Sequence, residues 1–380
     1  MFYFWVYMGT AIYNTFLPVY LNNIGLSKTS IASLLSIGPL IAILAQPIWG
    51  SLGDRSDSKN RILQILLLGS ALTILLFPLS EIYIYLLIVI CLTTFFQTSI
   101  YPLSDAITLE YLSQTKWNFG PIRLAGTIGF ALMSVVCGIV ARNQINSIFF
   151  MYFIIMIIAI LICSKLPKIK GYQSKGDTFS PLILLKNRNL MLFMIFSFFI
   201  QITMGYYYSF FPIYFQQLGG DNGLLGWSML FSSISELPFL LFGHKIVKRF
   251  GIHTVLLCTA FFAGIRWVFM FFVDNPYLVL PIQMLHGLIV IVLLVAIAIF
   301  IDNEVPKELK ASGQTFNALV SLGIARIVGS IIGGVASEYV GMRQVFLYNA
   351  VLAFITFLVF TFVFKREFKV VQQKVSVSIK

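Results

Sequence analysis

Five charged or titratable side chains interrupt long apolar stretches of this chain: Asp105, Arg123, Glu236, Arg266 and His286. A charge at the centre of a bilayer costs about 2.5–3.5 kcal/mol on insertion scales, so such residues usually face a cavity or a partner. Carboxylates and guanidinium groups can bind a polar solute, and an imidazole can carry a proton. What these groups can do depends on the elements that hold them.

The composition places those elements in a membrane. Of the 380 residues, 59% are apolar and 11% are charged, whereas a soluble globular chain is about 25% charged. A spanning helix needs roughly 20 mostly apolar residues. The chain is therefore predicted to be an all-α membrane protein with twelve transmembrane helices. These are expected at 2–22, 29–51, 61–80, 83–106, 121–141, 147–165, 189–217, 223–245, 254–273, 277–302, 314–337 and 343–364.

The basic residues predict how the chain is threaded. With twelve spans both termini lie on one side, and 20 of the 26 Lys and Arg residues fall in the tails and loops of that side, against three on the other. This split predicts that the first side is cytoplasmic, in a bacterial cytoplasmic membrane. The net charge of +12 is then an orientation signal beside anionic lipid. No nucleic-acid partner is expected, since the basic loops lack interleaved aromatic residues.

No cofactor or metal site is expected from the sequence. The four cysteines are scattered within apolar helices and have neither metal-ligand nor disulfide spacing. No nucleophile–base pair and no phosphate-binding loop is present, which argues against an enzyme. No basic segment precedes the first span and no cleavage site follows it, so no cleavable signal peptide is expected.

The chain repeats itself around a polar linker. The segment "YNTFLPVYLNNIG" (13–25) aligns with "YYSFFPIYFQQLG" (207–219) at an offset of 194 residues, with five identities. Parallel six-span halves are typical of a rocker-type secondary transporter, whose site lies between the halves near the midplane. The predicted domains are an N-terminal bundle at 1–166, a cytoplasmic linker at 167–188, a C-terminal bundle at 189–365 and a cytoplasmic tail at 366–380.

The loop "GSLGDRSDSKNR" (50–61) resembles the cytoplasmic signature of the major facilitator superfamily, G-x-L-x-D-R-x-G-R. The resemblance implies two pseudo-symmetric six-helix bundles that give alternating access to a central site. Gly50 would permit close helix packing, and the charged residues would form pairs that break when a cytoplasmic gate opens. The alternative is a solvated basic loop. The predicted gate residues are Gly50, Asp54, Arg55 and Arg61.

The segments "PLSDAITLEYL", "FGPIRLAGTIGF", "SISELPFLLFG" and "QMLHGLIVIV" resemble the branch of that superfamily that holds lactose permease, the nucleoside permeases and the phenylpropionate permeases. In lactose permease a carboxylate and an arginine 18 residues apart bind substrate, and Asp105 and Arg123 have that spacing here. The resemblance assigns proton coupling to Glu236, Arg266 and His286. The alternative for each set is a static ion pair, Asp105 with Arg123 or Glu236 with Arg266.

Two differences from lactose permease limit how far the roles of its residues can be assigned to this chain. Ile289 stands where that permease keeps a second carboxylate, and Phe130 stands where it has a sugar-stacking tryptophan. The proton route cannot be copied, and Glu236 becomes the leading candidate for the coupling proton. Apolar surroundings favour the protonated form of a carboxyl group, and an approaching arginine favours the ionised form.

Polar stripes on the central spans predict the remaining solute contacts. Together with the acid–arginine pair, the candidates are Asn14, Gln97, Asp105, Arg123, Gln201, Tyr208 and Gln283. The alternative role for the stripes is hydrogen bonding between helices. Arg326 is not explained by the resemblance. If it faces the cavity, three arginines oppose two carboxylates and favour an anionic solute such as an aromatic carboxylate; otherwise it reaches a backbone carbonyl across a small-residue contact.

These observations together predict a monomeric secondary transporter that imports a small organic solute, a sugar, nucleoside or aromatic acid, with protons. Its expected partners are the solute, protons and the lipid bilayer. The alternative function is proton-driven efflux of drugs or metabolites by antiport.

Overall fold

The computed structural model describes the whole chain except residues 116, 118, 171–186, 306–309 and 379–380. The regular structure of the described residues is helical throughout. The helices are α1 (Phe2–Asn23), α2 (Lys28–Arg55), α3 (Lys59–Ile74), α4 (Tyr83–Gln97), α5 (Ile100–Leu112), α6 (Phe119–Ala141), α7 (Ser147–Cys163), α8 (Arg188–Gln217), α9 (Asn222–Phe250), α10 (Ile252–Phe272), α11 (Pro276–Gln283), α12 (His286–Glu304), α13 (Lys310–Asn317), α14 (Ala325–Val340) and α15 (Met342–Ser378), with the short turn η1 (Phe77–Leu79) and the π-helical segment η4 (Ala318–Ile324).

The predicted all-helical membrane fold is confirmed, and each of the twelve predicted ranges is occupied by helix in the described residues. In the described part of the chain nine helical segments are long and apolar enough to cross a membrane by themselves. Four predicted spans are not continuous α-helices. They are the spans at 61–80, which divides into α3 and η1, at 83–106 (α4 and α5), at 277–302 (α11 and α12) and at 314–337 (α13, η4 and α14).

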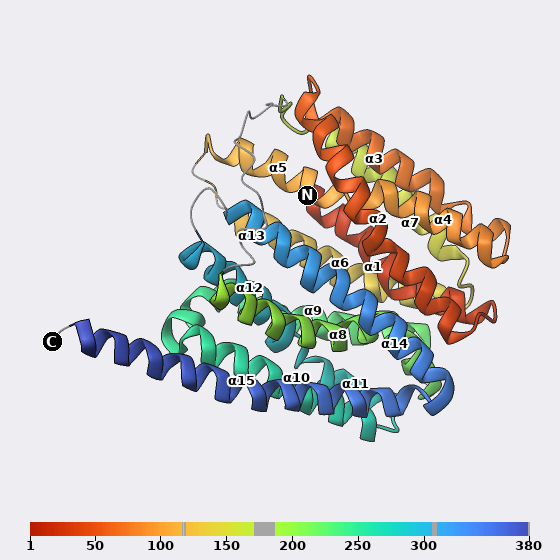
Figure 1. Ribbon diagram of the computed structural model, residues 1–380. Helices are drawn as coiled ribbons and strands as arrows, with labels where there is room; N and C mark the ends of the chain where they lie inside the picture. Colours follow the sequence, from red (N-terminus) through yellow and green to blue (C-terminus); the bar gives the residue numbers. More distant parts are fainter. Residues whose placement is uncertain (116, 118, 171–186, 306–309, 379–380) are drawn as a thin grey trace.

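The chain folds into two groups of helices that follow its order (Figure 1). Helices α1–α7 form one half and α8–α15 form the other. The predicted repeat has a conformational counterpart. Gly25 and Gly219, which end the first helix of each half, have φ values of 85° and 87°. Glycine adopts this left-handed conformation without strain, so both halves stop their first helix in the same way.

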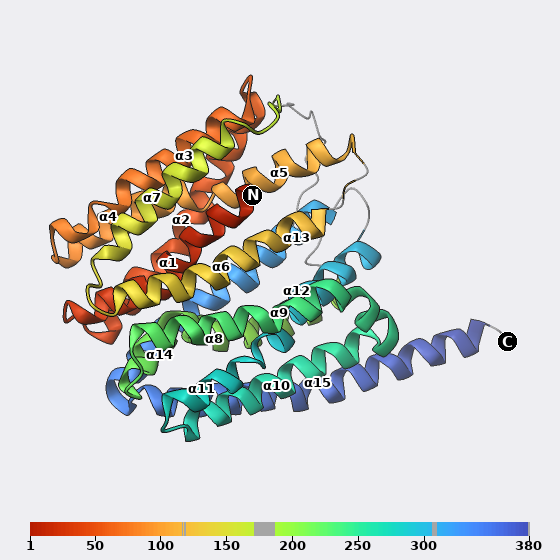
Figure 2. The same cartoon turned by 180° about the vertical axis from the view of Figure 1, so that it is seen from behind.

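The halves meet where α6 ends and α9 begins, and Figure 2 shows these two helices side by side. Gly138 of α6 faces the Asn222 backbone, and Gly226 of α9 faces the Ser134 backbone, with no room for a β-carbon at either glycine. The Asn222 amide also donates to the carbonyl of Ala141 at 2.8 Å. Backbone approach of this kind requires residues without side chains.

A second contact and an ion pair close the same end of the bundle. Arg142 and Asp221 join the halves at 2.6 Å, and the Thr29 hydroxyl donates to Glu338 between α2 and α14. We call this end the latch end. The opposite end carries the α2–α3 loop and the start of α8, and we call it the basic end. From the latch end the two halves diverge toward the basic end (Figure 1).

Gly226→Leu is expected to unlatch the halves, because its side chain would collide with the Ser134 backbone. Overpacking of this kind costs about 1–3 kcal/mol. That is enough to shift the equilibrium between the latched and the unlatched state by roughly 5- to 150-fold. In a cysteine-free background, the reporter Asn14→Cys should then react with a membrane-impermeant maleimide supplied at the latch end. Gly120→Leu is the matched control, since no atom of the described residues beyond its own stretch of helix lies within 4 Å of its β-carbon position. Equal labelling of both variants would contradict the latch.

Candidate functional site

The guanidinium group of Arg266 lies at the centre of a polar cluster in the C-terminal half. Its Nη2 donates to Gln283 Oε1 at 2.5 Å, and its Nη1 lies 2.9 Å from His286 Nδ1. The cation also lies over the rings of Tyr207 and Trp267, at 4.3 and 4.9 Å. Arg266 has no exposed surface. Its charge is therefore stabilised by neutral partners and aromatic faces.

Glu236 is not paired with Arg266, so the alternative of a static pair between them is wrong for this conformation. The carboxylate instead lies beside the imidazole, with Oε1 3.4 Å from His286 Nε2. Tyr208 Oη lies 3.4 Å from the same nitrogen. His286 thus connects Arg266 on one side to Glu236 and Tyr208 on the other.

The arginine fixes which ring nitrogen of His286 carries hydrogen. A guanidinium group only donates, so Nδ1 must accept and the neutral ring carries its hydrogen on Nε2, facing Glu236. A second hydrogen on Nδ1 would point at the Arg266 donor. The ring therefore stays neutral while Arg266 is in place. The side chain of Glu236 is 21% exposed, against 4% for His286.

A break in the tenth span positions His286. Helix α11 ends at Gln283 and α12 begins at His286, so the intervening turn leaves backbone groups without helical partners. Ser235 satisfies one of them: its hydroxyl accepts from Gly287 N–H at 2.9 Å, while its own hydrogen is donated to the Ser232 carbonyl of α9 at 2.6 Å. Gly287 lies so close to the Ser235 backbone that no β-carbon fits. Because Ser235 precedes Glu236, this contact also sets where the carboxylate lies.

Gln283 supports the cluster from inside the bundle. It has no exposed surface. Its Oε1 accepts from Tyr207 at 3.0 Å as well as from Arg266, and its Nε2 donates to Ser228 at 2.9 Å. Predicted as a solute contact, Gln283 here binds protein groups through both its oxygen and its nitrogen, which favours the alternative of hydrogen bonding between helices.

The N-terminal half holds a second polar cluster. Asp105 accepts from the Tyr3 hydroxyl at 2.6 Å, and the same hydroxyl lies 3.2 Å from Thr108. Arg123 lies 4.0 Å above the Tyr7 ring. Asp105 and Arg123 do not pair with each other in this conformation, so an ion pair does not lock the fourth and fifth spans.

The other predicted contacts differ in how far they are exposed. Asn14 is exposed on α1, and Tyr208 is half-buried. Gln97 is buried at the end of α4, and Gln201 is buried in α8. Gln97 and Gln283 have matching places, each ending the helix before a break in the fourth or tenth span.

Three residues of these clusters were missed or unexplained in the sequence. Tyr3 lies one turn before Tyr7 on the predicted polar stripe, and Ser235 directly precedes Glu236. Arg326 does not reach a backbone carbonyl: its Nε donates to Gln201 Oε1 at 3.3 Å, and its guanidinium lies 4.6 Å above the Tyr208 ring. The repeat already contained a signal for this residue, because "GPIRLAGTI" (120–128) matches "GIARIVGSI" (323–331) at an offset of 203 residues.

The predicted gate residues lie at the basic end. Asp54 lies 3.8 Å from Lys59, which also pairs with Glu110 at 3.0 Å. Arg55 and Arg61 are exposed. The close packing expected at Gly50 is absent, since no described atom lies within 4 Å of its β-carbon position.

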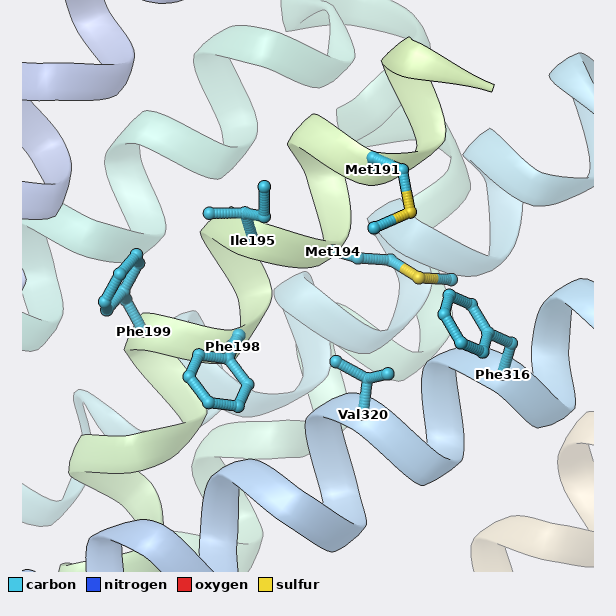
Figure 3. Close-up of a pocket in the computed structure, with 7 residues that line it drawn as sticks. All are labelled: Met191, Met194, Ile195, Phe198, Phe199, Phe316 and Val320. Atoms are coloured by element: carbon cyan, nitrogen blue, oxygen red, sulfur yellow. The ribbon is translucent and has the colours of Figure 1, made fainter. Parts of the chain in front are cut away.

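An apolar cavity of about 310 Å³ lies between α8 and the α13–η4 segment (Figure 3). The described side chains that line it are all apolar, so they offer a polar solute no hydrogen bond. We therefore place the candidate site at the two polar clusters. The lining residues are Met191, Met194, Ile195, Phe198, Phe199, Phe316 and Val320.

Known proteins resemble this chain over almost its whole length. It is 25% identical over 374 residues to the maltose permease of Geobacillus stearothermophilus, covering 97% of this chain and 94% of the permease. It is 24% identical over 360 residues to the multidrug resistance protein MdtG of Escherichia fergusonii, covering 88% and 86%. The crystal structure of the nucleoside transporter NupG superposes with a TM-score of 0.85 at 20% identity, covering 96% and 97%.

The similar proteins are transporters and not enzymes, and the superposition on NupG confirms the predicted fold. The model of the MFS_1 like family matches residues 1–348, which is most of the chain. The chain therefore belongs to the MFS_1-like family of the major facilitator superfamily and is a multi-pass membrane transporter of small solutes.

Proposed function

We propose that this transporter imports a small organic solute together with protons. The observation that carries the proposal is the chain of contacts from Arg266 through His286 to Glu236. It holds one carboxyl group at the edge of the buried cluster, within reach of water. A proton on that group changes the charge of the site, which is what coupling requires.

The charge distribution supports an orientation with the basic end in the cytoplasm and the latch end outside. Cytoplasmic loops carry an excess of Lys and Arg, as the basic end does here. With the latch closed, this conformation would then be the one that has just delivered solute inward. Opening the latch and closing the basic end would complete alternating access, with the gate residues Asp54, Arg55 and Arg61 approaching partners at that stage.

The hydrogen bond between His286 and Glu236 gives the proton a mechanical effect. An ionised Glu236 accepts from His286 Nε2–H, whereas a protonated one no longer holds a charge that attracts this donor. The Tyr208 hydroxyl lies beside the same nitrogen of His286, and the Arg326 guanidinium lies over the Tyr208 ring. A change in the protonation of Glu236 therefore changes the hydrogen-bond partners of His286 and Tyr208.

Glu236→Gln should remove accumulation of solute against a gradient while preserving exchange of solute across the membrane. The amide keeps the shape of the side chain but cannot release a proton. Proteoliposome uptake driven by a pH gradient and solute counterflow separate the two activities. Accumulation at the wild-type level would refute the role of Glu236.

Ser235→Ala should impair coupling without removing any charged group. It deletes the hydroxyl that joins α9 to the break before His286, at a cost of about 1 kcal/mol, which corresponds to roughly a fivefold change. The pH at which uptake is half-maximal should shift. Ser233→Ala is the matched control, because Ser233 is also buried on α9 but donates only to its own helix, at the Met229 carbonyl. A similar shift in both variants would contradict the positioning role of Ser235.

The direction of proton movement distinguishes import from efflux. The similarity to a multidrug resistance protein keeps proton-driven antiport as the second candidate. In vesicles containing a pH-sensitive dye, solute entering by symport should acidify the lumen. Alkalinisation on solute entry would reject symport and establish antiport.

A further inference from the structure

The two arginines that lie outside the buried cluster occupy equivalent places in the repeat. In the segments 120–128 and 323–331, the pattern is G-x-x-R-x-x-G-(T/S)-I, with identity at four of nine positions. Arg123 is the arginine of the first copy and Arg326 that of the second. The copies lie in α6 and at the junction of η4 with α14, in the fifth and eleventh spans.

The arginines also have equivalent surroundings. Arg123 lies 4.0 Å above the ring of Tyr7 on α1, and Arg326 lies 4.6 Å above the ring of Tyr208 on α8. The helices α1 and α8 are the first of each half. Missing side chains allow both contacts: a β-carbon at Gly126 would collide with the Tyr7 ring, and one at Gly205 would collide with the Arg326 backbone.

Neither guanidinium group has a carboxylate partner among the described residues. Asp105, the acid expected beside Arg123, accepts from Tyr3. Arg326 uses only its Nε, toward Gln201. Both arginines are half-buried, and their terminal nitrogens are absent from the buried polar atoms without partners. Each arginine therefore presents accessible donors that no described protein group uses.

The charges at this level of the bundle do not balance. Three arginines, Arg123, Arg266 and Arg326, oppose two carboxylates, Asp105 and Glu236, while His286 is neutral. When Glu236 takes up a proton, the excess of positive charge grows by one. Since unpaired charge is costly at this depth, the loaded site is complementary to an anion.

We infer that Arg123 and Arg326, one from each half, together bind the acidic group of the transported solute, and that this solute is a small aromatic carboxylate. The carboxylate accepts from the two guanidinium groups, and its ring packs beside Tyr7 and Tyr208. Glu236 lies beside the second of these tyrosines, since its Oε1 and the Tyr208 hydroxyl are each 3.4 Å from His286 Nε2. The inference concerns the solute of the proposed transporter and rests on that function only for the transport step.

This arrangement links the solute to the proton. An ionised Glu236 would repel the solute carboxylate, so the anion binds best after Glu236 is protonated. One anion then crosses with one proton, and the cycle carries no net charge. Uptake should respond to a pH gradient and not to the membrane potential.

The test uses two pairs of probes of nearly equal shape: benzoate with benzamide, and 3-phenylpropionate with 3-phenylpropionamide. Thermal stabilisation of the purified full chain measures binding, and proteoliposome uptake measures transport. We expect at least one acid to stabilise the wild type while its amide does not. Losing a hydrogen bond to a charged group should weaken binding of that acid by roughly 10- to 100-fold in both Arg123→Gln and Arg326→Gln.

Two further variants keep the result interpretable. Arg326→Lys retains the charge and should recover part of the affinity. Arg343→Gln removes an arginine that pairs with Asp274 outside the site, and it should bind the acid like the wild type. Arginine variants that unfold, judged by their melting without ligand, are replaced by the lysine variants at both positions, which should lose affinity by a smaller factor.

The outcomes separate this inference from the proposed function. No stabilisation of the wild type by either acid, equal binding of acid and amide, or unchanged affinity in Arg326→Gln would overturn the anion site. Proton-coupled uptake of a neutral solute would do the same while leaving the proposed function intact. Arginine-dependent binding of the acid without proton-coupled uptake would support the anion site and overturn the proposed function.

Discussion

The buried guanidinium group of Arg266 is the constraint on which the C-terminal half of the site depends. A buried cation without a counterion needs partners for its donors and cover for its faces. Gln283 and His286 accept from its two terminal nitrogens, and Tyr207 and Trp267 cover its faces, while its Nε has no partner. Each partner is thereby fixed in turn. The glutamine oxygen must face the arginine, and the imidazole must accept on Nδ1. Removing any partner would leave a charge or a donor unsatisfied at full desolvation cost.

Close backbone contacts between helices fix where the residues of this cluster lie. Gly287 lets the backbone of α12 touch the backbone of α9 at Ser235. This direct contact sets the distance between His286 and Glu236, the residues next to it. Gly138 and Gly226 do the same between the halves at the latch end. Membrane helices gain little from apolar attraction to one another, since lipid is equally apolar. Small residues and satisfied polar groups therefore determine where these helices pack.

The sequence predicted the crossings and the polar residues better than their partners. Apolar length identifies a span, and a titratable residue in a span is noticeable because it is expensive there. Pairing depends on side-chain geometry over short distances, and spacing along the chain does not encode it. Asp105 thus binds Tyr3, which lies 102 residues away, and not the expected Arg123. The residues between the two helices at each break, 98–99 and 284–285, include no glycine or proline. Nothing in the apolar pattern therefore indicated a break there.

The two halves of the repeat differ in the polar groups that they hold. The equivalents of the repeat, Arg123 and Arg326, both lie on tyrosines with accessible donors. The buried cation has no counterpart, because α3, the third span of the N-terminal half, carries no charged residue after Arg61. Only the C-terminal half can therefore hold an imidazole in one tautomer against a carboxyl group. Ile289, fully buried one turn after His286, adds no second acid. In the proposed mechanism, Glu236 is thus the proton acceptor of the cluster, and the symmetric arginines bind the solute.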